Sequence, residues 1–214
     1  MKNDIEWRRA FVRSGFLFAE TATGFSFSSE AGHNIEYLRK LVFQLGLSEQ
    51  SEDIFASRMF YPPELKVDEG KWLTAIEQLH TGTEGGSSHD LEQMDTFMGG
   101  IVRWVGKAGM PTSYSCDGHN RNIAELVFLS RTDGILFDYF LRWSGIRVRY
   151  AAPQLLTVRQ FPQSDLGFPL SDSRYWLLDV AEQIHSKLSV LQEFVQAGHR
   201  LAPPRAQAAG RLAK

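Results

Sequence analysis

A polar segment near the middle of the chain carries the residue types most suited to chemistry. Residues 112–121 are Thr-Ser-Tyr-Ser-Cys-Asp-Gly-His-Asn-Arg. A cysteine is nucleophilic as the thiolate, which a nearby imidazolium or guanidinium favours. We therefore predict Cys116 as a nucleophile and His119 as the acid/base, with Asp117 orienting them. Gly118 would allow the turn that brings them together. The alternative is a buried, inert cysteine beside an ordinary Asp-Gly turn.

Arginines and small polar side chains around this segment could bind an anionic substrate. Arg147 and Arg149 alternate along a predicted strand and so share one face, where guanidinium groups can hold a phosphate or a carboxylate. With Arg121 and Tyr114 they form a local basic and aromatic grouping that suggests contact with a nucleotide or RNA. The alternative is a solvated sheet face. The predicted substrate-binding residues are Ser113, Tyr114, Ser115, Asn120, Arg121, Arg147 and Arg149.

A metal site is a second interpretation of the same segment. Cys116 and His119 place a sulfur and an imidazole at a spacing that one zinc ion can use, and His89, His80 or Asp90 could complete the ligand shell. The sequence has no second pair of this kind and no His-Glu-x-x-His motif. We therefore predict no cofactor, with zinc on Cys116, His119 and His89 as the alternative. Residues 82–88 lack the Lys-Ser/Thr of a P-loop, and Gly-x-Ser-x-Gly is absent.

The same segment resembles a loop of a known family. A helix, the Gly109-x-Pro111 break and residues 112–119 are similar to a Thr/Ser-rich Ser-Cys-x-Gly loop in the wybutosine-synthesising tRNA methyltransferase family, and to Ser-Cys-x-Gly-His loops of uncharacterised bacterial and phage proteins. The resemblance implies a loop that lines a small-molecule or RNA pocket, with Ser115, Cys116 and Gly118 at corresponding positions. That family has arginine where this chain has His119, so methyl transfer is not implied.

Apolar spacing predicts the elements that position this segment. Helices are predicted where apolar residues recur at three and four, and strands where they alternate. Gly46 and Asp68 act as stop and start signals in the first part of the chain. The predicted helices are 4–18, 35–45, 72–79, 91–108, 133–143 and 172–198, and the predicted strands are 112–116, 124–129, 146–150 and 155–160. The pattern predicts an α+β fold, with a small, mostly antiparallel sheet covered by helices, a helical N-terminal part and a long C-terminal helix.

The predicted organisation is one α+β domain over residues 1–200. Residues 1–80 form its mainly helical part and residues 89–200 its sheet-containing part, with the Gly- and Ser-rich residues 81–88 as a connection. A chain of 214 residues can bury a core without disulfides. Residues 201–214, which include two adjacent prolines and many alanines, are predicted to be a disordered tail.

Bulk properties restrict the classes of partner. A formal charge of -2, from 23 Lys and Arg against 25 Asp and Glu, gives no global field that would attract nucleic acid or an anionic membrane. No apolar run approaches the roughly 20 residues that span a bilayer. The start lacks the apolar core of a signal peptide, and the single cysteine fits a reducing compartment, so we predict a cytoplasmic protein with no membrane partner.

These observations leave two hypotheses and do not decide whether the protein is an enzyme. The first is an enzyme that acts on a nucleotide or nucleic-acid substrate through Cys116 and His119, with arginines binding an anion. The second is a non-catalytic binding or scaffold subunit that docks a protein partner, or another copy of itself, through the predicted helix 172–198. A solvent-reachable thiol near His119 favours the first, and a dry thiol against Val127 and Phe128 favours the second.

Overall fold

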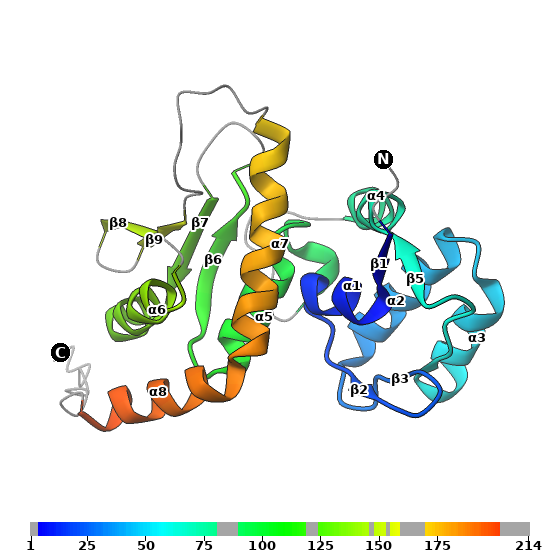
Figure 1. Cartoon of the computed structure of the whole chain (residues 1–214), viewed down its shortest axis with the longest axis horizontal. Helices are drawn as coiled ribbons and strands as arrows, with labels where there is room; N and C mark the ends of the chain where they lie inside the picture. Colours follow the sequence, from blue (N-terminus) through cyan, green and yellow to red (C-terminus); the bar gives the residue numbers. More distant parts are fainter. Residues whose placement is uncertain are drawn as a thin grey trace, which may run out of the picture.

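The computed structural model describes residues 4–80, 90–118, 124–145, 148–152, 155–158 and 170–201 (Figure 1). The first part contains β1 (Asp4–Glu6), α1 (Trp7–Ser14), β2 (Ala19–Glu20), β3 (Phe25–Ser26), α2 (Gly32–Gln44), α3 (Ser48–Ser57), β4 (Met59–Phe60), β5 (Lys66–Asp68) and α4 (Glu69–Leu79). The second contains the 3₁₀ turn η1 (Leu91–Gln93), α5 (Gly99–Lys107), β6 (Thr112–Cys116), β7 (Ala124–Phe128), α6 (Arg131–Trp143), β8 (Val148–Ala152), β9 (Leu155–Val158), α7 (Leu170–Ser186) and α8 (Leu188–Leu201).

The first part is helical, as predicted, but it also contains two small antiparallel sheets that apolar spacing did not reveal. Their strand orders are β1-β5 and β2-β3-β4. Strands of two or three residues are too short for an alternating pattern to register. Phe11 of α1 lies at the centre of this part. Its ring lies within 6.3 Å, centroid to centroid, of seven other aromatic rings, those of Trp7, Phe16, Phe18, Phe25, Phe27, Phe60 and Trp72.

The second part is organised around a four-stranded antiparallel sheet of order β6-β7-β9-β8. One face carries the buried side chains of β7, and α6 packs on it through a ring contact of 5.3 Å between Phe128 and Phe137. The other face holds the cross-strand pairs Tyr114 with Val127 and Cys116 with Glu125. These four side chains are half-buried or exposed, and we call this surface the Tyr114 face.

The α+β fold with small antiparallel sheets is confirmed, and the strands and helix near the site lie close to their predicted bounds. The continuous helix predicted over 91–108 is wrong. Its first turn is η1, and the α-helix begins only at Gly99. A Cβ atom on Gly100 would lie 2.3 Å from the carbonyl oxygen of Arg13, so α5 starts where it crosses α1 with no room for a side chain. Apolar spacing alone does not show this crossing.

The helix predicted over 172–198 is divided. α7 ends at Ser186 and α8 begins at Leu188, and the two run in different directions (Figure 1). No glycine or proline marks the bend, so the apolar spacing continues through it. The bend lets each helix pack on different elements: α7 contacts α1 and α5, whereas α8 contacts α6. A single cluster of buried apolar residues runs through both parts of the chain.

Candidate functional site

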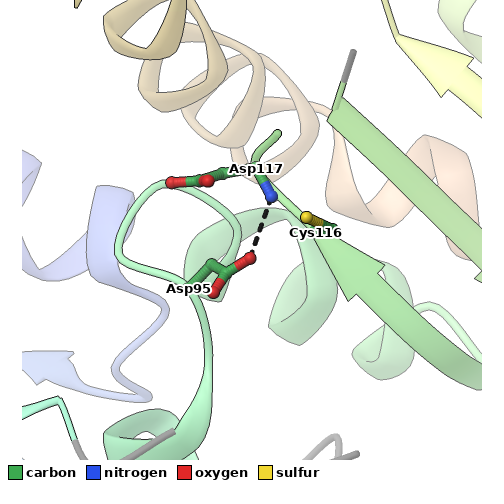
Figure 2. Close-up of side chains that lie close together, drawn as sticks. All are labelled: Asp95, Cys116 and Asp117. Carbon is green, nitrogen blue, oxygen red and sulfur yellow. Dashed lines mark hydrogen bonds between the residues drawn. The ribbon is translucent and has the colours of Figure 1, made fainter. Parts of the chain in front are cut away.

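The end of β6 brings a thiol and two carboxylates together. The main-chain N–H of Asp117 donates a hydrogen bond of 2.9 Å to Oδ2 of Asp95, which lies in the loop between η1 and α5 (Figure 2). One ligand atom from each of Asp95, Cys116 and Asp117 lies within 4.8 Å of the other two. We call these three residues the thiol–carboxylate cluster.

The thiol of Cys116 is half-buried and remains protonated at neutral pH. Burial raises the pKa of Cys116, as do the negative charges of Asp95 and Asp117, and these effects outweigh the hydrogen bonds that favour the thiolate. One of those bonds comes from the main-chain N–H of Gly118, 3.3 Å from Sγ, and another from the hydroxyl of Tyr114. Gly118 has a φ of 81°, so it supplies the left-handed turn that the sequence predicted.

Tyr114 lies on the same sheet face as Cys116 and precedes it by two residues in β6. Tyr114 is 42% exposed. The hydrogen bond to the Cys116 sulfur is the largest cause that raises the pKa of Tyr114, to about 12, and burial and the nearby Glu125 act in the same direction. Tyr114 is therefore a neutral phenol with its ring partly open to solvent. An exposed, neutral ring on a sheet face is suited to stacking against a planar ligand.

A guanidinium reaches the cluster from α7. Nη1 of Arg174 lies 3.3 Å from Oδ2 of Asp117, and its Cζ lies 4.6 Å from the centre of the Phe97 ring. Nη2 is 3.7 Å from the carboxylate of Glu77, which is beyond hydrogen-bond range. Nε is buried and has no hydrogen-bond partner among the residues that the structure describes. The Asp117 side chain is 2% exposed, so Arg174 compensates a buried charge.

An imidazole approaches from the end of α4. Nε2 of His80 lies 4.0 Å from Oδ1 of Asp95, and Nδ1 is buried without a hydrogen-bond partner within the described ranges. From the sequence, His80 was named as one possible metal ligand. The sequence did not predict that Asp95 and Arg174 belong to this site. They lie 22 and 57 residues from Asp117, so only the tertiary fold brings them to it. The sequence contains no signal for this proximity.

Five of the predicted site residues belong to stretches that the structure does not describe. His119, Asn120, Arg121, Arg147 and His89 lie outside the described residues. The pairing of Cys116 with His119 therefore stays a prediction.

The remaining predicted site residues lie at separate positions. Ser113 is exposed beside a β-bulge and donates a hydrogen bond of 3.5 Å to the carbonyl of Val127. Ser115 pairs across the strands with the buried Leu126, so it belongs to the opposite face from Tyr114. Asp90 caps η1 by accepting a hydrogen bond from the N–H of Glu92.

The backbone register aligns Arg149 with Cys116. Across the sheet, Cys116 pairs with Glu125, Glu125 with Thr157, and Thr157 with Arg149, so the four occupy one row. Three strand spacings separate the ends of this row, or about 14 Å. The backbone of this row therefore suits a ligand of about that length.

Comparison with protein-family models found no match, and comparisons with curated proteins and with solved structures found none either. The resemblance to the wybutosine-synthesising family therefore stays a prediction. Within the described part of the chain, every helix is too short or too polar to cross a bilayer.

Proposed function

We propose that this protein binds a nucleotide or a single-stranded nucleic acid across the Tyr114 face. The observation that carries this proposal is the exposed ring of Tyr114 on an antiparallel sheet face, since aromatic rings on such faces stack on bases. Arg149 at the far end of the same register row supports it, because a ligand about 14 Å long would span the row from Cys116. Glu125 lies in this row and disfavours a phosphate beside it, so we expect a base or sugar at that position.

Catalysis at the same place is the enzymatic form of the proposal. Cys116 would act as nucleophile and His119 as acid/base, with Asp117 orienting them. Because burial and two carboxylates raise the pKa of Cys116, the thiol needs a base to lose its proton when the substrate binds. Asp117 already accepts from Arg174, which suits a positioning role. Replacing Cys116 by Ser and His119 by Ala should abolish turnover of a bound nucleotide and leave its affinity nearly unchanged.

Binding is tested with fluorescently labelled single-stranded RNA and DNA, by anisotropy at two salt concentrations. Loss of one base–aromatic stack costs about 1–3 kcal/mol, so Tyr114→Ala should weaken binding by roughly 5- to 150-fold. Tyr114→Phe keeps the ring and should bind normally. Tyr61→Ala is the matched control, because Tyr61 has a 41% exposed side chain in the first part of the chain. Equal affinities for Tyr114→Ala and Tyr61→Ala would contradict the proposal.

Zinc binding stays a proposal, and the ligands that the structure offers differ from the predicted Cys116, His119 and His89. Of the predicted ligands, Cys116 is described, and the neighbours that could join it are Asp95, Asp117 and His80. Zinc binding would require the thiolate and shorter distances than the cluster has without an ion. Metal analysis of the purified protein, with Cys116→Ser as the comparison, tests this. A metal content that is the same in both proteins, or zero in both, would contradict it.

The alternative function is a non-catalytic binding subunit that docks a protein through α7 and α8. The exposed Tyr175, Val190 and Phe194 on these two helices support it. If the protein retains its biological effect with Cys116→Ser and His119→Ala combined, this alternative replaces the enzyme. We propose the cytoplasm as its location, because one free cysteine suits a reducing compartment.

A further inference from the structure

An apolar surface lies on the outer side of α6 and α8, away from the Tyr114 face. On α6, the exposed apolar side chains are spaced by four residues: Ile135, Tyr139 and Trp143 are 37%, 60% and 65% exposed. On α8, Val190 and Phe194 are also four apart and are 45% and 42% exposed. Residues four apart on a helix lie on one side of it, so each helix presents a stripe. We call these five residues the α6–α8 face.

The two stripes lie on the same side of the helix pair. α6 and α8 run antiparallel, since His199 is 2.6 Å from Asp133 at one end and Lys187 Nζ is 4.8 Å from the Trp143 ring at the other. Val190 and Phe194 precede Gly198 by eight and four residues, and a Cβ atom on Gly198 would lie 2.6 Å from the Leu136 side chain of α6, so both lie along the side of α8 that meets α6. The five side chains therefore form one continuous surface.

We propose that two copies of this chain form a twofold dimer through the α6–α8 face. The first argument is size. A fully exposed large apolar side chain presents roughly 150–250 Å², so the five exposures sum to on the order of 500 Å². A stable interface buries about 800 Å² on each partner, of which about 65% is apolar in homodimers. The apolar area of this face is what such an interface needs, and it is near the upper end for a monomer surface.

The second argument is charge. α6 contains Arg131 and Arg142 against Asp133 and Asp138, and α8 contains Arg200 against Glu193, so each helix has a formal charge of zero when His199 of α8 is neutral. Lys187, whose Nζ lies 4.8 Å from the Trp143 ring, adds one positive charge beside this face. With a single uncompensated charge the face can meet its own copy with little like-charge repulsion, and it has no strong field that would select a strongly charged partner. This favours a second copy over an acidic or basic protein.

The third argument is self-complementarity. Ile135 and Trp143 lie at equal distances on either side of Tyr139, so a twofold axis at Tyr139 places Tyr139 against the partner's Tyr139, and Ile135 against the partner's Trp143. Packing of the four-residue ridges of both helices gives the commonest crossing angle in globular proteins, about −50°. The same surface patch then serves both copies, as a twofold interface requires.

Sedimentation velocity of the full chain from roughly 1 to 100 µM tests the dimer. We expect a dimer with a dissociation constant in the micromolar range. Trp143→Glu and Tyr139→Glu should raise this constant by at least about 30-fold, as expected of central interface residues. Because both side chains are already exposed, the thermal midpoint of each variant, measured at a concentration where the wild type is monomeric, should stay unchanged.

Phe55→Glu on α3 is the matched control, because Phe55 is 68% exposed, slightly more than Trp143 at 65%. It should leave the dimer intact. A wild-type chain that is monomeric at the highest concentration would overturn the proposal. So would a dimer that Trp143→Glu leaves intact, or one that Phe55→Glu disrupts equally.

A designed cross-link tests the position of the axis. In a Cys116→Ala background, Tyr139→Cys should form an intermolecular disulfide on mild oxidation, since residue 139 faces its own copy. Leu65→Cys, at a side chain that is 88% exposed in the first part of the chain, should not. Equal cross-linking at the two positions would contradict a twofold axis at Tyr139.

Discussion

Arg13 and Arg174 are both largely buried arginines that contact carboxylates, yet their surroundings differ. Arg13 is 8% exposed and uses Nε, Nη1 and Nη2 for Glu182, Glu69 and Asp179. Arg174 makes one hydrogen bond, to Asp117, and leaves a buried Nε without a partner among the described residues. The comparison indicates that Arg13 is saturated and serves stability, whereas Arg174 retains capacity for a further acceptor. A partly satisfied group beside a cluster of ionisable side chains is typical of a ligand site.

The largest expected effect is the difference in unfolding free energy that is lost when each of the two arginines is replaced by leucine. Arg13→Leu should lower the free energy of unfolding by about 3–5 kcal/mol, because it leaves the buried Glu69 without its guanidinium. Arg174→Leu should cost about half of that or less, because it breaks one hydrogen-bonded ion pair, with Asp117, where Arg13→Leu breaks three. Urea denaturation of both variants measures the difference. Equal losses would mean that Arg174 is as structural as Arg13.

The second prediction concerns the reactivity of Cys116, which is the only cysteine and so reports unambiguously. Alkylation by iodoacetamide should be slow at pH 7 and should rise with pH beyond the range of an ordinary thiol, because the pKa of Cys116 is raised. Asp95→Asn removes a negative charge and should accelerate alkylation several-fold at pH 8. Tyr114→Phe removes a donor that favours the thiolate and should slow it.

Asp53→Asn, an exposed position on α3, is the control for the loss of one negative charge and should leave the rate unchanged. If Asp95→Asn and Tyr114→Phe shift the rate in the same direction, then the Asp95 charge and the Tyr114 hydroxyl do not act on the pKa of Cys116 in opposite directions, and the prediction is wrong.

The smallest expected effect is the pH dependence of stability that His185 causes, on the same helix as the carboxylates that Arg13 contacts. Burial lowers the pKa of His185, as do the charges of Arg8 and Lys107, and the imidazole lies 4.5 Å from the Trp104 ring. A histidine with a lowered folded pKa stabilises the fold when neutral. Its contribution is present above the unfolded pKa of about 6.5 and is lost as pH falls through the folded pKa. Urea unfolding at pH 7.5 and 5 should show this loss in the wild type and less of it in His185→Gln.

Glu182 does not interfere in this pH range. Burial acts to raise its pKa, but hydrogen bonds from Arg9 and Arg13 outweigh it, so the pKa is lowered from its usual 4.5. The stability that Glu182 contributes is therefore complete above about pH 4.5 and is lost only in stronger acid. A loss of stability between pH 7.5 and pH 5 that is equal in the wild type and in His185→Gln would contradict the role given to His185.

The sequence predicted local elements well where local spacing decides them. Residues 112–116 form the predicted strand. Asp68 caps the start of α4, as predicted, and Gly46 follows the end of α2 with a φ of 81°. The sequence prediction failed where a contact between distant segments decides, as at Gly100, which crosses α1, and at the bend between α7 and α8. The candidate site shows the same limit. Cys116 and Asp117 were foreseen from residue type, whereas Asp95 and Arg174 depend on packing.

α7 also connects the end of β6 with α1. Its residue 174 holds the end of β6 through Asp117, and its residue 182 is held by two arginines of α1. These positions are eight residues apart on one helix, or about 12 Å along a rigid rod. A ligand that displaced Arg174 from Asp117 would therefore act on the same helix that forms the ion pairs with α1. Ligand binding at the sheet would then change how strongly α7 is held against the N-terminal part of the chain.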